Sequence, residues 1–201
     1  QELLTKDATI REIHHRVKNN LQTVAALLRL QSRRVTDEAA RAALDEAVRR
    51  VGTIALVHET LSQGIDESVN FDDIAVRGLR AIVEVATREH RVDSTFTGSF
   101  GRMRAEDATA LAMIISELVQ NAVEHAFGPG GGTITLAVNR IRDRVRLRVS
   151  DDGVGLPERF DPSESLGLSI VTTLVEGELD GTLAFERRSG GGTTVAITLN
   201  V

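Results

Sequence analysis

The amino-terminal part of the chain carries two long runs of apolar residues at helical spacing. Between residues 4 and 34 they recur every three or four positions, which predicts one amphipathic helix, at Ile10, Ile13, Val17, Leu21, Val24 and Leu28. Thr36 can cap a second helix, in which steps of four and three indicate a heptad seam at Ala40, Leu44, Ala47, Val51, Ile54, His58 and Leu61. A single helical hairpin cannot cover both of its apolar faces, so we expect two copies to pair into a homodimeric four-helix bundle.

The pattern changes after a polar stretch that runs from Gln63 to Asn70, and we place a domain boundary near residue 66. Beyond it, the patterns predict helices at 71–88, 105–127 and 166–179 and strands at 92–97, 133–139, 144–150, 182–188 and 193–200. Helices on one side of a mostly antiparallel sheet make an α+β layered domain. The expected fold is therefore an all-α helical hairpin over residues 1–65, followed by an α+β domain over residues 66–201.

Composition narrows the classes of function. The 201 residues are 41% hydrophobic with a formal net charge of -5, and the basic residues are scattered along the sequence, which argues against nucleic acid as a direct ligand. The chain has no cysteine, which excludes disulfides and thiolate metal sites. It also has no apolar run of membrane-spanning length and no signal peptide, so we expect a cytoplasmic protein. Because it begins with Gln1 and enters a helix almost at once, we expect a fragment whose upstream part is missing.

Two adjacent histidines, His14 and His15, lie within the first predicted helix. At helical spacing His15 falls almost opposite the apolar stripe and faces solvent, whereas His14 lies at the margin of the stripe. Glu12 precedes His15 by three residues on the same polar face. Another domain can reach and modify an exposed imidazole on a rigid helix, although a simply solvated histidine fits the pattern as well. His58, on the seam of the second helix, is interpreted as a satisfied core histidine.

A carboxylate, an amide and an imidazole share one face of the predicted helix at 105–127. Glu117, Asn121 and His125 are spaced by four residues, while apolar residues supply the opposite, buried side. Such a row can hold a hydrated Mg²⁺ and the oxygens of a polyphosphate, because Mg²⁺ prefers oxygen ligands and keeps several waters. An exposed polar stripe without a ligand explains the same spacing.

Glycines lie at the ends of predicted strands and helices at three places. Asp151 and the nearby Gly153 and Gly155 come directly after a strand, so the backbone can approach a flat ligand while the carboxylate accepts a hydrogen bond from an exocyclic amine. Residues 156–165 read as a short mobile cover, and Gly167 opens the next helix, whose free N-H groups can bind a phosphate. Three glycines then precede Thr193 at a hairpin tip. A β-turn is the alternative explanation for the first place, and a tight turn with φ > 0 is sufficient for the third taken alone.

Four segments in this order resemble the N, G1, G2 and G3 boxes of the Bergerat ATP-binding fold, namely ELVQNAVEHAF, DDGVG, SLGLSIV and GGGTT. Gyrase, Hsp90, histidine kinases and MutL share this fold. The segment HHRVKNNLQTVAALLRLQSRR resembles the dimerisation and phosphoacceptor helix of sensor histidine kinases related to the HWE subfamily, with the PdtaS-type soluble kinases as the most similar members. The resemblance extends over nearly the whole chain.

The resemblance implies a role for each matching position. His15 would be the phosphoacceptor, and ATP and Mg²⁺ would be the cofactors. The other positions would bind the nucleotide and its metal ion: Glu117 beside Mg²⁺ over the phosphates, Asn121 on Mg²⁺, His125 on the same helix face, Asp151 on the adenine amine, Gly153 and Gly155 around the pocket, Gly167 and Leu168 at the phosphates, and Thr193 on the adenine side. It also implies a homodimer and transfer of the phosphoryl group to an aspartate of a response regulator, which in PdtaS-type systems carries an RNA-binding output domain.

Three positions depart from the family pattern. Arg16 follows the acceptor where the commonest kinases have an acid, so Glu12 is our candidate for the acid that orients or deprotonates His15. Glu124 stands where a lysine is usual, and Ser165 replaces a glycine of the lid. Other proteins with this pocket give the competing hypotheses: a nucleotide-gated ATPase of the Hsp90 or MutL type, an anti-sigma-factor serine kinase, or an inactive dimeric scaffold.

Overall fold

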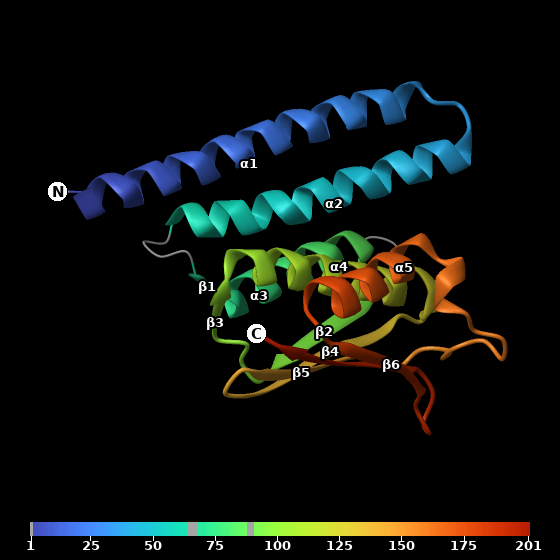
Figure 1. Ribbon diagram of the computed structural model, residues 1–201. Helices are drawn as coiled ribbons and strands as arrows, with labels where there is room; N and C mark the ends of the chain where they lie inside the picture. Colours follow the sequence, from blue (N-terminus) through green and yellow to red (C-terminus); the bar gives the residue numbers. More distant parts are fainter. Residues whose placement is uncertain (1, 64–67, 88–90) are drawn as a thin grey trace. The chain divides into compact units, whose positions relative to one another are not determined.

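The computed structural model describes residues 2–63, 68–87 and 91–201, and the chain divides into two compact units, Gln1–Val69 and Asn70–Val201 (Figure 1). The sequence-based boundary near residue 66 lies outside the described residues. Within the described part of the chain, no helix is sufficiently long and apolar to cross a membrane. Each unit is described by itself below.

The first unit is a hairpin of two long antiparallel helices, α1 (Glu2–Arg34) and α2 (Glu38–Gln63) (Figure 1). Ala25 of α1 and Val57 and Leu61 of α2 are buried between them. The start of α2 differs from the sequence-based prediction, because Asp37 rather than Thr36 caps it. The Asp37 carboxylate accepts a hydrogen bond from the Ala40 N-H at 2.7 Å, and so satisfies one of the free N-H groups of the first turn.

The apolar stripe predicted for α1 does not all face α2. Ile13 and Val24 are 52% and 44% exposed, whereas Ala25 is buried. The inward face is therefore rotated relative to the predicted stripe, and His14 lies half-buried in the hairpin instead of at its margin. The physical reason is that apolar residues extend over a wide arc of α1, of which one neighbouring helix covers only a part.

The second unit is built on a five-stranded sheet with the order β2-β4-β5-β7-β6. The strand bounds are β2 (Val92–Thr97), β4 (Gly132–Ile141), β5 (Arg144–Asp151), β6 (Thr182–Arg187) and β7 (Thr193–Asn200). Only the β2–β4 pair is parallel among these neighbours, which confirms the predicted mostly antiparallel sheet. Two short strands outside this sheet, β1 (Ser68–Asn70) and β3 (Arg102–Arg104), were not predicted.

Helices cover one face of the sheet and leave the other face open (Figure 1). They are α3 (Phe71–Ala86), α4 (Ala105–His125) and α5 (Leu166–Thr173). The core between the layers follows the alternation of the strands, with fully buried side chains at Ile134, Leu136, Leu147, Ile197 and Leu199. Against them α4 places its own buried side chains, among them Leu111, Ile114 and Leu118.

The predicted helix at 166–179 is two elements. α5 ends at Thr173, and a turn of π-helix, η2 (Leu174–Glu178), continues it. A short 3₁₀ turn, η1 (Pro162–Glu164), precedes α5, and the Asp161 carboxylate caps it by accepting from the Ser163 N-H at 2.9 Å. The end of β5, the loop after it and the start of α5 all lie next to α4, and this arrangement creates the site described next.

Candidate functional site

A cavity of about 700 Å³ lies in the second unit, and six elements contribute to its walls. One wall is apolar and comes from α4, β5, α5, β6 and β7, with Leu118, Ala122, Val149, Leu168, Phe185 and Val195. The opposite side is the loop at 156–165, which adds Leu156, Phe160 and Ser165. Six of the predicted site residues line it, namely Asn121, His125, Asp151, Gly155, Leu168 and Thr193. The cavity has the size and the mixed lining of a small-molecule site.

Asp151 is a buried carboxylate in the wall of this cavity, with an exposed fraction of 7%. Its Oδ1 accepts hydrogen bonds from the backbone N-H groups of Gly153 at 2.9 Å and Thr193 at 3.3 Å. Burial raises the pKa of Asp151, and these two backbone N-H groups oppose the rise. Oδ2 has no hydrogen bond from the described residues, so Asp151 can accept one from an amine of a ligand.

The glycines of this region are required by close backbone approach. A Cβ at Gly153 would lie 2.1 Å from the carbonyl oxygen of Ala126, to which the Val154 N-H also donates at 2.9 Å. A Cβ at Gly192 would lie 2.0 Å from the carbonyl oxygen of Asp151, and Gly155 has a φ of +80°. The loop after β5 therefore packs directly on the end of α4 and on the β6–β7 turn, which fixes the Asp151 side chain in place.

Helix α4 adds further polar groups to the cavity. Asn121 lines it, and its side-chain Nδ2 is buried without a hydrogen-bond partner in the described part of the chain. Glu117, one helical turn earlier, is 2% exposed, and a Cβ at Gly167 would lie 2.6 Å from its Oε2. His125 lies at the rim with a side chain that is 74% exposed. The structure therefore brings Glu117, Asn121 and the start of α5 close together.

This donor set fits a divalent ion that keeps part of its hydration shell. Carboxylate and amide oxygens are the ligands that Mg²⁺ prefers, and Glu117 and Asn121 supply one of each. Among the described residues there is no group of three or more His, Cys, Asp or Glu side chains that could hold a metal ion by itself. A bound Mg²⁺ would therefore need water and the oxygens of a ligand to complete its coordination.

The loop at 156–165 is attached to β6 by two contacts. The rings of Phe160 and Phe185 pack edge to face with centroids 5.0 Å apart, and the Arg187 guanidinium donates to the Pro157 carbonyl oxygen. At the far end of the loop, the Ser165 hydroxyl caps α5 by accepting from the Leu168 N-H at 3.4 Å. Serine in place of glycine thus provides an N-cap at the start of α5.

Three residues of the cavity, and Arg188 next to Asp151, were not found from the sequence. The guanidinium of Arg188 donates to the Asp151 carbonyl oxygen at 2.7 Å across 37 residues of sequence, and Phe160 and Phe185 close one side. Arg159, also on the loop, lines the cavity and provides a cation there. In the sequence, Arg188 could have been noticed because it stands beside the glycine-rich hairpin tip. Arg159, Phe160 and Phe185 lie in ordinary loop and strand patterns, which do not mark them as site residues.

The hairpin places His15 and Glu12 on the exposed side of α1, and no hydrogen bond or ion pair joins these two described side chains. His14 is turned inward, and its Nδ1 lies 3.0 Å from the Nδ1 of His58 on α2. His58 is thus a half-buried histidine with a hydrogen-bond partner, as the heptad position indicated. Burial lowers the pKa of both histidines, and the pKa of His58 is lowered further by His14.

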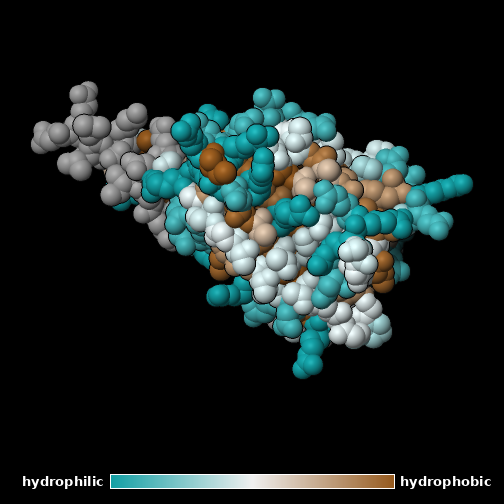
Figure 2. Space-filling view, turned by 90° about the horizontal axis from the view of Figure 1, so that it is seen from below, coloured by the Kyte–Doolittle hydropathy of each residue, from teal (hydrophilic) through white to brown (hydrophobic). Residues whose placement is uncertain are grey.

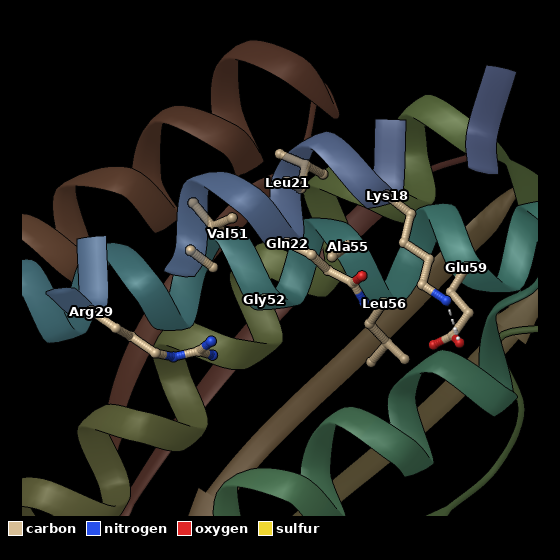
Figure 3. Close-up of a pocket in the computed structure, with 10 residues that line it drawn as sticks. Lys18, Leu21, Gln22, Arg29, Val51, Gly52, Ala55, Leu56 and Glu59 are labelled. Carbon is tan, nitrogen blue, oxygen red and sulfur yellow. Dashed lines mark hydrogen bonds and ion pairs between the residues drawn. The ribbon is translucent and has the colours of Figure 1, made fainter. Parts of the chain in front are cut away.

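A groove of about 400 Å³ runs along the hairpin between α1 and α2 (Figure 3). Its floor is apolar, with Leu21, Ala25, Val51, Ala55 and Leu56, and its rim is polar, with Lys18, Gln22, Arg29 and Glu59. Lys18 Nζ and Glu59 Oε1 form an ion pair across the groove at 2.9 Å. Gln22 and Arg29 follow His15 by seven and fourteen residues, so at helical spacing they lie on nearly the same side of α1.

Two family models match the chain. One, described as "Histidine kinase", matches residues 12–86, and the other, described as "Histidine kinase-, DNA gyrase B-, and HSP90-like ATPase", matches residues 106–201. The chain is 50% identical to the sensor histidine kinase PdtaS of Mycobacterium tuberculosis H37Rv, over 99% of the chain and 40% of that protein. It is 51% identical to PdtaS of Mycolicibacterium smegmatis, over 99% of the chain and 41% of that protein. The chain thus spans about two fifths of the length of these curated relatives.

A solved structure is similar over both units. The histidine kinase domain of the Erythrobacter litoralis EL346 blue-light activated histidine kinase matches with a TM-score of 0.69 and 28% sequence identity, over 98% of this chain and 94% of that one. The match confirms the expected order of two long helices followed by an α+β ATPase domain.

Proposed function

The chain belongs to the histidine kinases, and from this premise we propose that it is the catalytic core of a two-component sensor kinase that phosphorylates itself on His15. The observation that carries the proposal is a pair of polar groups that line one cavity. Asp151 offers a free carboxylate oxygen, and Asn121 has a buried amide nitrogen without a partner in the described part of the chain. Adenine fits the first, and a Mg²⁺-bound triphosphate fits the second.

In the proposed reaction, Glu117 and Asn121 would hold Mg²⁺, and the ion would offset charge on the phosphate oxygens. The unprotonated nitrogen of His15 attacks the γ-phosphorus in line, a P-N bond forms, and the P-O bond to ADP breaks. The imidazole proton passes to Glu12, which precedes His15 by one turn on the exposed face of α1, or to water. Six further residues shape the nucleotide pocket, namely His125, Gly153, Gly155, Gly167, Leu168 and Thr193. Glu124 stands where a lysine is usual, and Arg159 takes over the positive charge of that lysine.

The phosphoryl group then passes from His15 to an aspartate of a response regulator. We propose that the regulator docks on the groove beside His15, because its apolar floor and charged rim can hold a helix of a partner protein. The exposed Ile13, Val24 and Leu27 on α1 fit a second copy of the hairpin, which supports a homodimer. By the same family resemblance, the regulator carries an RNA-binding output domain and the kinase acts in the cytoplasm.

The test is autophosphorylation of the purified chain with Mg²⁺ and γ-labelled ATP, in the wild type and in His15→Gln and His14→Gln. We expect a label that is stable to base and labile to acid, that is lost in His15→Gln, and that persists in His14→Gln. A label that persists in His15→Gln would exclude this acceptor. Binding of ATP without any label would favour the scaffold, and release of free phosphate without label would favour the ATPase.

A further inference from the structure

The open face of the five-stranded sheet carries a straight row of arginines on its central strand. Arg144, Arg146 and Arg148 alternate with the buried Val145, Leu147 and Val149, so all three side chains leave β5 on the side away from the helices. Figure 2 views the chain from the sheet side of Figure 1 and shows mainly pale and teal residues there, with long hydrophilic side chains that project outward. The arginines are scattered in the sequence of an acidic chain, but the strand aligns three of them.

The residues beside this row are uncharged. In the strand register Arg144, Arg146 and Arg148 lie beside Asn200, Thr198 and Ala196 of β7 and beside Ile141, Asn139 and Ala137 of β4, of which only Ile141 is large and apolar, with an exposed fraction of 66%. Arg148 forms an ion pair with Glu186 of β6 at 3.2 Å, with side chains that are 55% and 48% exposed. Among the described residues, Arg144 and Arg146 have no acidic partner. Two of the guanidinium groups thus remain available to another molecule, and the third is held only by an exposed ion pair, which a ligand carboxylate can replace.

We propose that this surface, formed by Arg144, Arg146 and Arg148, binds an acidic protein segment in extended conformation. Side chains two residues apart on a strand repeat at about 6.8 Å, so carboxylates at alternate positions of an extended segment match the spacing of the three guanidinium groups. Each guanidinium can hold one carboxylate through two parallel hydrogen bonds. The proposal does not depend on autophosphorylation, because none of the three arginines lines the nucleotide cavity or the hairpin groove.

A single-stranded nucleic acid has a similar spacing of charges but fits this surface less well. Binding of bases uses aromatic side chains as stacking platforms. The positions beside the arginine row on β4 and β7 are isoleucine, asparagine, threonine and alanine, none of them aromatic, and the strand phenylalanines Phe96 and Phe185 belong to the opposite side of the sheet. An acidic peptide needs only the charges and the flat backbone of the platform.

The experiment measures fluorescence anisotropy of a labelled ten-residue peptide of alternating threonine and glutamate at about 0.1 M salt. The triple substitution Arg144→Gln, Arg146→Gln and Arg148→Gln is expected to weaken binding about tenfold or more, since three exposed ion pairs are lost. The triple substitution to lysine keeps the charges and is expected to retain part of the affinity. A matched control replaces three exposed helical arginines, Arg33, Arg34 and Arg80, with glutamine and is expected to bind like the wild type.

Equal loss of binding in the control would overturn the proposal, because the effect would then follow from net charge alone. Unchanged binding in the β5 triple glutamine variant would also overturn it, and a lowered melting temperature in that case would indicate that the arginine stems only cover the sheet. A labelled ten-nucleotide oligothymidine provides the last comparison. If it binds more tightly than the peptide and loses affinity in the same variant, the surface is one for nucleic acid and the proposal is wrong.

Discussion

The Nδ1 atoms of His14 and His58 lie 3.0 Å apart and connect the two helices of the hairpin one residue before His15. Their ring centroids are 5.2 Å apart, and the ring planes are inclined by 41°. A hydrogen bond between two Nδ1 atoms requires that one ring donates and the other accepts, so at least one of the two histidines must be neutral. The contact therefore holds the rotation of α1 against α2 only while that neutral state is kept.

The first prediction concerns the pH dependence of hairpin stability. Both histidines have a pKa below the ordinary value of 6.5, so the unfolded chain takes up protons at a higher pH than the folded chain does. Protonation consequently favours unfolding, and the free energy of unfolding is expected to fall as the pH decreases below about 6.5. Urea denaturation at pH 7.5 and 5.5 measures this. His58→Gln should show a smaller difference between the two pH values, and an unchanged difference would rule out the pair as its source.

The second prediction concerns Asp151 as the acceptor for the adenine amine. Asp151→Asn is expected to lower the affinity for ADP about tenfold or more, because a hydrogen bond to a charged group is lost in a buried site. Since the pKa of Asp151 is raised, ADP affinity of the wild type should decline on acidification at a higher pH than for an ordinary aspartate. Calorimetric titration with ADP measures both effects. Asp143→Asn, on the exposed β4–β5 turn, is the control and should bind ADP like the wild type.

The third prediction compares two glycines near the nucleotide pocket. Gly153→Ala would place a Cβ 2.1 Å from the backbone carbonyl oxygen of Ala126, so the loop after β5 must shift and carry Asp151 with it. We expect ADP affinity to fall at least about tenfold and the melting temperature to decrease. Gly190→Ala has open space around its Cβ and should behave like the wild type in both measurements. Equal effects of the two substitutions would contradict the packing argument.

The fourth prediction concerns the ion pair across the hairpin groove. Lys18 and Glu59 are 18% and 32% exposed, so their contact should stabilise the hairpin by about 0.5 to 1 kcal/mol. Lys18→Glu is expected to destabilise the chain, and the exchanged pair Lys18→Glu with Glu59→Lys should recover most of that loss. A double-mutant cycle from chemical denaturation gives the coupling energy. A coupling energy near zero would show that the pair makes no net contribution.

The sequence by itself predicted most elements of the second unit. The strict alternation of polar and apolar residues in Arg144–Asp151 predicts a strand with one buried face. The spacing of Glu117, Asn121 and His125 by four positions predicts that they share one face of a helix. Both signals depend on the geometry of a single element, so they are complete in the sequence. The outward direction of His15 on α1 is of the same kind and agrees with its exposure in the structure. The roles of these side chains came from the order of the motifs and stay predictions.

Tertiary structure decided which side of each element meets a partner. The apolar arc of α1 allowed several rotations, and packing against α2 turned His14 inward to His58 while it left Ile13 exposed. Arg188 reaches the Asp151 carbonyl oxygen because the β6–β7 turn folds back over the end of β5, across 37 residues. Periodicity describes the faces of one helix or strand, whereas such contacts depend on how separate elements pack. Close packing therefore fixed these contacts, and the local sequence pattern could not.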